Sequence, residues 1–340
     1  MRAVSVAFGV SLVALMFFVE HLKLRVRVFP ALLIFFVLAV FGLGNSIWSE
    51  GRSVFTVFVA LAAFGMAWSV LYFKTTLLFF ELPFYMFLAF TLSLILMGYG
   101  PSEFNSVLQG YSRNGYSAVL LIFAVGYMFS RHYSGKSISL CLMAVVVLCS
   151  IPLYGRTGIA MATALFLVAL WSRSKFMALG LGLLGLAVIV IFSSEIEQYI
   201  TTRTNFSSGV DSPRALMWMD YLARLDFIGV AFGQDLNAVP LIAEYNGNPH
   251  NAFFLLHSYY GLGFFVLMLA LCVSLVTLGL ERRWLCLFLA LVYLVRSFFD
   301  IIYLFGLLDY LVFPILFYCF FRGEGGISFS GRRVTRAQFN

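Results

Sequence analysis

The chain has 340 residues, of which 62% are hydrophobic and only 11% are charged, and its mean hydropathy is +0.97. This composition excludes an ordinary soluble domain. Apolar runs of about 20 residues, the length that crosses a bilayer as a helix, recur along the sequence. The runs do not alternate between apolar and polar residues, so they also exclude membrane-spanning strands. We therefore expect an all-α, polytopic transmembrane helical bundle.

The sequence contains eleven candidate spans, and we expect eleven or twelve in all. They cover residues 3–19, 28–48, 54–73, 76–98, 117–130, 138–154, 157–171, 176–193, 250–280, 284–304 and 306–321. We expect a single transmembrane domain over residues 1–340. A long loop at 194–249 is predicted to contain short amphipathic helices, and residues 322–340 form a tail.

Successive spans would leave loops on alternate sides of the membrane. Lysine and arginine are distributed unevenly between the loops of the two sides. One set holds fourteen of these residues, and the other holds seven, with no lysine among them. Because positively charged loops stay in the cytoplasm, the richer set, with the 322–340 tail, is predicted to be cytoplasmic. The 194–249 loop then faces outside. The net charge of +7 requires no nucleic-acid partner, because basic loops meet anionic membrane lipids.

No sequence motif predicts a cofactor or a metal site. The stretch Gly180–Gly185 matches the dinucleotide pattern GxGxxG. It lies in an apolar span with no strand before it, so close helix packing is the better interpretation. The pair Glu195 and Glu197 is a weak candidate for metal ligands, and a solvated pair is the favoured alternative. We therefore expect neither cofactor nor metal.

Two arginines lie at predicted helix starts on the outer side. Arg156 lies beside the amino end of the 157–171 span, with Thr157 as the predicted cap. Arg214 falls in the first turn of a helix that has Ser212 as its cap and Pro213 as its first residue. This second helix has a broad apolar side. A plain interfacial helix along the membrane surface is therefore the alternative to a site there.

Two histidines lie near the start of the 250–280 span. Asn248 is the predicted cap of that helix, Pro249 its first residue and His250 its second. His257 is seven residues further on, so both histidines would share one face, with His257 about 10 Å deeper. For His257 we favour a structural role, with a hydrogen bond to a neighbouring helix.

Arg156, Arg214 and His250 together predict a site for a phosphorylated ligand. A helix amino end offers free N–H groups and a partial positive charge, and the forked donors of arginine match phosphate. The dipole and the arginines disfavour a cationic histidine, so His250 would stay neutral and accept a proton. Arg296 and Asp300, four residues apart in one span, either form a mutual ion pair or line the site, with equal weight for both.

These residues give the chain a resemblance to the O-antigen polymerase and O-antigen ligase superfamily of bacterial inner-membrane glycosyltransferases. The motifs that carry the resemblance are, in order, Gly155-Arg156-Thr157-Gly158, PRALMW, FIGVAFGQ and PHNAFFLLHSYYGLG, over about residues 150–270. The first five spans match the family only in being apolar. Members commonly have an even number of spans, so a count of eleven means that a first span is missing or that two are merged.

The resemblance implies a fold like that of the lipid-sugar-dependent glycosyltransferases and a metal-independent reaction. The donor would be a glycan on undecaprenyl pyrophosphate, and the acceptor a glycan or a lipid-linked glycan, at the periplasmic face. The family's paired arginines correspond to Arg156 and Arg214, which would neutralise the leaving pyrophosphate. Its histidine corresponds to His250, which would deprotonate or orient the acceptor hydroxyl. A chain-length regulator is a further expected partner. The expected supporting residues are Tyr154, Asn251, His257, Arg296 and Asp300.

The short chain and modest outer loop slightly favour a polymerase, whose acceptor is a second lipid-linked glycan. The closest alternative is a ligase that transfers the glycan to lipid A core. A transporter or flippase of an anionic lipid or solute would need charged residues on several spans. Only Arg296 and Asp300 are clearly buried, and Glu81 is a third candidate. A non-catalytic membrane scaffold would not need His250.

Overall fold

The computed structural model describes residues 25–48, 53–153, 155–194, 213–301 and 304–321, together with the single residues 7, 10, 11 and 14. Within these ranges the chain has no strand, and 79% of it is helical. The predicted all-α class is therefore confirmed. The predicted span at 3–19 falls almost wholly outside the described residues. So do Tyr154, Glu195 and Glu197, and the 322–340 tail.

Four helices are long and apolar enough to cross a membrane, and the predicted total of about eleven spans is not confirmed. The four are Phe29–Trp48 within α2 (Arg25–Trp48), Ser53–Tyr72 (α3), Leu77–Leu96 (η1, Leu77–Glu81, and α4, Leu82–Leu96) and Gly263–Leu280 (α15). Shorter apolar helices are Leu140–Ser150 (α7), Lys175–Gly185 within α9 (Lys175–Ile191) and Trp284–Ser297 (α16). By length and composition, these helices make the chain a helical membrane protein.

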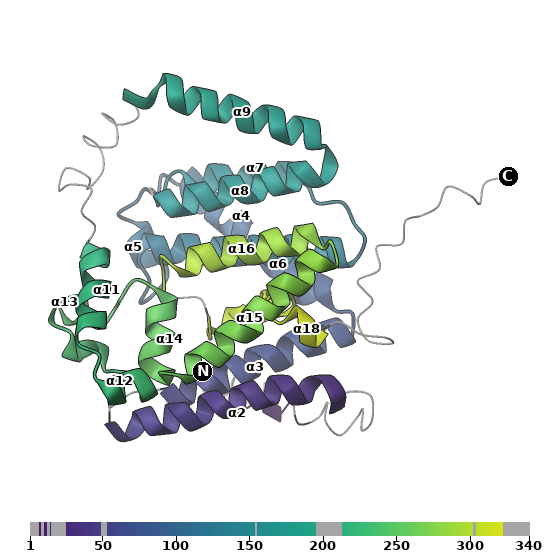
Figure 1. Cartoon of the computed structure of the whole chain (residues 1–340). Helices are drawn as coiled ribbons and strands as arrows, with labels where there is room; N and C mark the ends of the chain where they lie inside the picture. Colours follow the sequence, from purple (N-terminus) through teal and green to yellow (C-terminus); the bar gives the residue numbers. More distant parts are fainter. Residues whose placement is uncertain are drawn as a thin grey trace.

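The remaining helices include many short segments. They are α5 (Phe104–Val107), α6 (Arg113–Tyr133), α8 (Arg156–Arg173), α11 (Pro213–Ala223), α12 (Phe227–Phe232), η3 (Leu236–Ala238), α13 (Pro240–Ala243), α14 (Ala252–Tyr260), η4 (Leu307–Leu311), α17 (Phe313–Leu316) and α18 (Tyr318–Phe321). The long helices α2, α3, α6, α8 and α16 run side by side, and α11, α12 and α13 gather beside one end of them (Figure 1). We call this the α11 end of the bundle.

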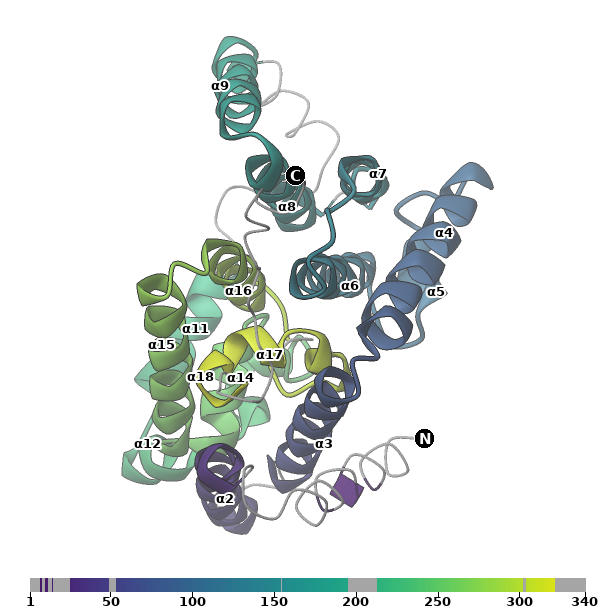
Figure 2. The same cartoon turned by 90° about the vertical axis from the view of Figure 1, so that its right-hand side faces the viewer.

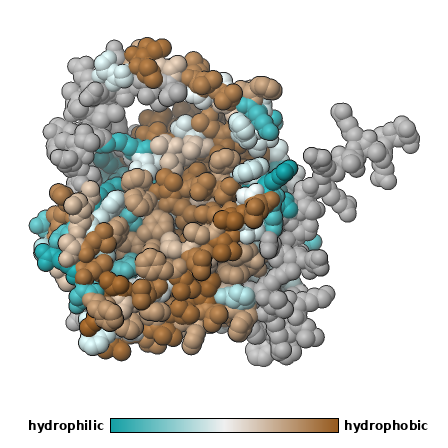
Figure 3. Space-filling view, in the orientation of Figure 1, coloured by the Kyte–Doolittle hydropathy of each residue, from teal (hydrophilic) through white to brown (hydrophobic). Residues whose placement is uncertain are grey.

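The surface of the bundle has the polarity expected of helices that cross a membrane along their length. Hydrophobic residues cover most of the middle of the face in Figure 3. Hydrophilic residues gather at the left edge, where α11 and α13 lie, and at the right-hand ends of the upper helices. An apolar band between two polar ends is what a bilayer requires of the helices that it surrounds.

The predicted span at 250–280 is wrong as a single helix, because it breaks into α14 and α15. Gly261 lies at the break with φ +46°, in the left-handed region that favours glycine. A Cβ there would lie 2.3 Å from the backbone oxygen of Ala231, which also accepts a hydrogen bond from the Leu262 N–H at 3.1 Å. This contact with α12 ends α14, which stands nearly upright in Figure 1 whereas α15 runs obliquely.

The last two predicted spans also differ from the structure. The span at 284–304 ends as a helix at Ser297, and the span at 306–321 consists of the short helices η4, α17 and α18. Figure 2 shows α17 and α18 enclosed by α3, α15 and α16. Asp309, which is fully buried, accepts hydrogen bonds from the Tyr293 hydroxyl and the Gly306 N–H, both at 2.6 Å. Irregular backbone is tolerated at this depth because protein surrounds it.

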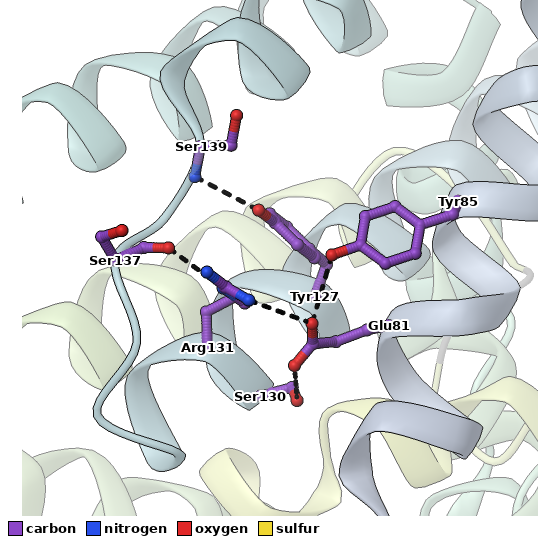
Figure 4. A network of polar contacts seen from close by, with 7 residues as sticks. All are labelled: Glu81, Tyr85, Tyr127, Ser130, Arg131, Ser137 and Ser139. Atoms are coloured by element: carbon purple, nitrogen blue, oxygen red, sulfur yellow. Dashed lines mark hydrogen bonds and ion pairs between the residues drawn. The ribbon is translucent and has the colours of Figure 1, made fainter.

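A buried polar network joins η1, α4, α6 and the loop that follows α6 (Figure 4). Glu81 is 1% exposed and accepts hydrogen bonds from the hydroxyls of Ser130 at 2.9 Å and Tyr85 at 3.2 Å. Its other contact is an ion pair with Arg131, in which Nη1 and Oε2 are 3.5 Å apart. Arg131 Nε also donates to the Ser137 carbonyl at 3.0 Å. The expected burial of Glu81 is therefore confirmed, and the charge is paired.

Replacing Glu81 with alanine is expected to reduce the free energy of unfolding by about 3 kcal/mol, because it leaves the guanidinium of Arg131 without its carboxylate. The change should appear as a lower melting temperature of the protein in detergent. Glu244→Ala is the control, since Glu244 is exposed. Equal melting temperatures for the two variants would contradict a stabilising role for this network.

Candidate functional site

The structure brings Arg156, Arg214 and His250 together at the α11 end. Arg156 is the first residue of α8, Arg214 is the second residue of α11, and His250 lies just before α14. The charges of the two arginines act on each other, and the charge of Arg214 acts on His250. Three segments that are well separated in the sequence therefore contribute basic groups to one region.

Close packing of α8 against α6 fixes the position of Arg156. The cap of α8 is Gly155 and not the predicted Thr157, because the helix begins two residues earlier than that cap implies. A Cβ at Gly158 would lie 2.1 Å from the hydroxyl oxygen and 3.2 Å from the Cβ of Ser117 on α6, so a larger residue would have to displace that side chain where the two helix starts meet. Arg156 itself is exposed.

Arg214 lies in the first turn of α11, which begins at Pro213 as predicted. The predicted cap, Ser212, lies outside the described residues. Arg214 is half-buried, and this burial is the main cause that lowers its pKa. Asp300 raises that pKa, and Arg296 lowers it. Because a guanidinium is not deprotonated in proteins, Arg214 supplies a permanent positive charge in a partly dehydrated position.

The apolar residues of α11 are divided between two surroundings. Met217 and Tyr221 are buried in a small core formed with η3 and α13. Leu216, Met219 and Leu222 remain more than half exposed. One side of α11 therefore packs on protein, and the other side is exposed. The exposed side has the composition of a surface that contacts lipid.

The helix that follows His250 begins later than predicted. Its cap is Asn251, whose side-chain oxygen accepts hydrogen bonds from the backbone N–H groups of Phe253 at 2.8 Å and Phe254 at 3.2 Å. The first helical residue is Ala252. The predicted placement of His250 inside the helix, on one face with His257, is therefore wrong.

His250 is held in a left-handed backbone conformation, with φ +50°. Its N–H donates to the side-chain oxygen of Asn248 at 2.8 Å, so the predicted cap forms a local turn instead. The imidazole ring packs edge-on against Tyr245, with centroids 5.8 Å apart. A non-glycine residue in this conformation costs on the order of 1–3 kcal/mol, and such residues cluster at functional sites.

The surroundings of His250 favour the neutral imidazole. Burial is the largest cause that lowers its pKa, and the positive charge of Arg214 lowers it further, whereas Asp300 raises it. The predicted causes were the helix dipole and the arginines. Arg214 does lower the pKa of His250, but His250 lies outside the helix, and the largest cause is burial. A neutral imidazole at neutral pH is able to accept a proton.

This lowered pKa predicts a pH dependence for any reaction that uses His250 as its base. A base works only when unprotonated, so activity should persist below the ordinary pKa of histidine and be lost as the pH falls through the lowered value. Arg214→Gln should move this acidic limb to higher pH, and Asp300→Asn should move it to lower pH. The pH profile of kcat/KM measures both shifts, and shifts in one common direction would contradict this electrostatic account.

His257 has the structural role that the sequence favoured. Its Nδ1 atom forms a hydrogen bond of 2.8 Å with the hydroxyl of Tyr221 on α11. The two rings also meet edge-on, with centroids 5.9 Å apart. His257 therefore ties α14 to α11.

Arg296 and Asp300 form the ion pair that the sequence predicted, and they also border the site. Arg296 Nη2 donates to Asp300 Oδ2 at 3.0 Å and to the Asn114 carbonyl at 2.8 Å. The Arg296 side chain is 5% exposed and that of Asp300 is 12% exposed. Both charges act on Arg214, and Asp300 also acts on His250. The two predicted roles are thus not exclusive.

Two buried donors near these groups lack a hydrogen-bond partner in the described part of the chain: Arg296 Nε and Asn251 Nδ2. A buried donor without a partner costs about 1–3 kcal/mol. The third such atom, Trp68 Nε1, belongs to α3. Ligand oxygens that reached Arg296 and Asn251 would satisfy both donors.

Sequence reasoning missed the contacts of Trp218 and Tyr245. The Trp218 indole donates to the Pro249 carbonyl at 3.1 Å, and Tyr245 packs against the ring of His250. The first contact joins residues 31 positions apart, so no local pattern predicts it.

No family model, no curated protein and no solved structure matches this chain. Within the described ranges, no group of three or more His, Cys, Asp or Glu side chains is placed to hold a metal ion. Functional inference therefore rests on the site residues at the α11 end and on the motifs that contain them.

Proposed function

We propose that this chain is a bacterial inner-membrane glycosyltransferase that polymerises undecaprenyl-pyrophosphate-linked repeat units of O-antigen or a related polysaccharide at the periplasmic face. The observation that carries the proposal is the convergence of Arg156, Arg214 and His250 at one end of a helical membrane protein. The motifs around these residues resemble those of O-antigen polymerases and ligases. This resemblance is the basis for proposing a lipid-linked glycan as the substrate.

The proposed reaction uses each of the three residues. A hydroxyl oxygen of the acceptor sugar forms a bond to the anomeric carbon of the donor, and the bond from that carbon to the phosphate oxygen breaks. The electron pair leaves with the pyrophosphate, whose negative charge Arg156 and Arg214 would neutralise. His250 takes the hydroxyl proton, a role that requires the neutral ring.

The buried donors of the site support an oxygen-rich ligand. Asn251 Nδ2 and Arg296 Nε are both buried without a partner in the described chain, and phosphate or sugar oxygens are acceptors that would satisfy them. A transporter remains the alternative from another class. Against it, the buried charges at Glu81 and Arg296 are paired with Arg131 and Asp300. Paired charges are less suited to carrying an ion across the membrane.

Deleting the gene in its native bacterium tests the proposal and separates it from the ligase. A polymerase deletion leaves short lipopolysaccharide that carries one repeat unit. A ligase deletion leaves bare lipid A core and accumulates lipid-linked polymer. Loss of the glycan from the cell surface, with lipid-linked repeat units trapped on the cytoplasmic side, would instead point to a flippase and overturn the proposal.

A further inference from the structure

Trp218 contacts three segments, each of which carries or adjoins a residue of the site. Trp218 follows Arg214 by four residues on α11, so the two side chains lie on the same side of the helix. Its ring stacks on Phe254 of α14, with centroids 5.7 Å apart and an angle of 14°. Its ring also meets Phe298 edge-on at 5.0 Å. Phe298 lies between Arg296 and Asp300 in the sequence.

The indole N–H of Trp218 holds the peptide group that precedes His250. Pro249 has no backbone N–H, so its carbonyl is the only backbone group through which it can be anchored. That carbonyl accepts from Trp218 Nε1 at 3.1 Å. The N–H on the other side of the same peptide group belongs to His250 and donates to Asn248 at 2.8 Å. Both polar atoms of this peptide group are therefore fixed.

Fixing this peptide group matters because His250 has an uncommon backbone conformation. A residue at φ +50° returns to a more common conformation unless its neighbours hold it. Asn248 is on the same loop as His250 and would move with it. Trp218 belongs to a different element, which is itself tied to α14 through the hydrogen bond between Tyr221 and His257. Among the contacts described for this peptide group, only the one from Trp218 reaches it from another helix.

We propose that Trp218 is a positioning residue that sets the distance and orientation of His250 relative to Arg214 and Asp300. This inference rests on the proposed glycosyl transfer. It assigns Trp218 to the alignment of the base with the cations and not to contact with the substrate. A displacement of about 1 Å of a catalytic group costs up to 100-fold in rate, so a small shift of the His250 loop would be measurable.

The test compares Trp218→Phe with the wild-type full chain in lipid nanodiscs. Phenylalanine removes the N–H donor and one of the two fused rings but keeps an aromatic ring beside Phe254 and Phe298, which limits damage to the fold. We expect kcat for glycan elongation to fall about 10-fold, with the KM for the lipid-linked donor within twofold of wild type. Hydrogen exchange at the His250 amide should become about 10-fold faster, while exchange in α6 stays unchanged.

Trp284→Phe is the matched control, because Trp284 is 52% exposed at the start of α16. It should leave kcat and the exchange rate unchanged. A wild-type kcat and a wild-type exchange rate in Trp218→Phe would overturn the proposal. A raised KM with unchanged exchange would overturn it too, because that result means substrate contact. If the wild-type chain elongates no lipid-linked glycan, the proposed function fails. The exchange rate still decides whether Trp218 holds the loop.

Discussion

Replacing His250 with alanine is expected to lower the rate of glycan elongation by about 100-fold or more, with normal expression and membrane insertion. A positioned general base contributes about 10²–10⁴-fold, and alanine removes the only imidazole placed beside Arg214 and Asp300 in the described chain. The loss should fall on kcat, because the arginines that would hold the donor pyrophosphate remain. Steady-state elongation of a lipid-linked oligosaccharide measures it.

His132 provides the control for this substitution. It lies in the last turn of α6 and interacts with Arg283, next to the start of α16. Asn114, whose carbonyl contacts Arg296 of the site, is at the opposite end of α6. His132→Ala should retain wild-type elongation. If His250→Ala leaves the length distribution of the glycan unchanged, His250 is not the base, and a scaffold or transport role gains weight.

Replacing Arg214 with alanine is expected to reduce kcat by roughly 100-fold to 1,000-fold, the usual effect of removing one donor to a developing negative charge. Arg214 is half-buried and adjoins Arg296 and Asp300, so its charge is poorly screened. Arg214→Lys keeps the charge but loses the forked donor geometry, and we expect an intermediate rate. Arg156→Ala should have a smaller effect, because Arg156 is exposed.

Arg224, the residue that follows α11, is the matched control. Its side chain is 49% exposed and is paired with Asp220 of α11, with Nε and Oδ1 2.7 Å apart. Arg224→Ala should leave kcat unchanged. Similar losses for Arg214→Ala and Arg224→Ala would show that general positive charge in and beside α11, and not the Arg214 site, is what matters.

Long apolar runs made the first part of the fold predictable. The expected spans at 28–48, 54–73 and 76–98 agree with α2, α3 and the η1–α4 pair to within a few residues. Hydrophobicity alone could not locate the break at Gly261, because the break depends on a backbone contact with Ala231 of another helix. The same holds for the segment around Asp309, whose irregular backbone is stabilised by a hydrogen bond from Tyr293.

The grouping of Arg156, Arg214 and His250 could be expected from the sequence because each follows a turn on the same predicted side of the membrane. The local geometry of His250 could not. The pair Asn248-Pro249 fits the usual start of a helix, and the choice of Asn251 as the cap follows from the left-handed conformation of His250. That conformation is held partly by Trp218, which lies 31 residues from Pro249.

The most direct test of the proposed function uses the purified chain in nanodiscs with an undecaprenyl-pyrophosphate-linked oligosaccharide, with and without EDTA. Mass spectrometry of the lipid-linked products reports their length. We expect products longer by whole repeat units, at equal rates with and without the chelator, and elongation slower by about 100-fold or more with His250→Ala. Failure to elongate the lipid-linked glycan, or elongation that stops when EDTA is added, would contradict a metal-independent polymerase built on Arg156, Arg214 and His250.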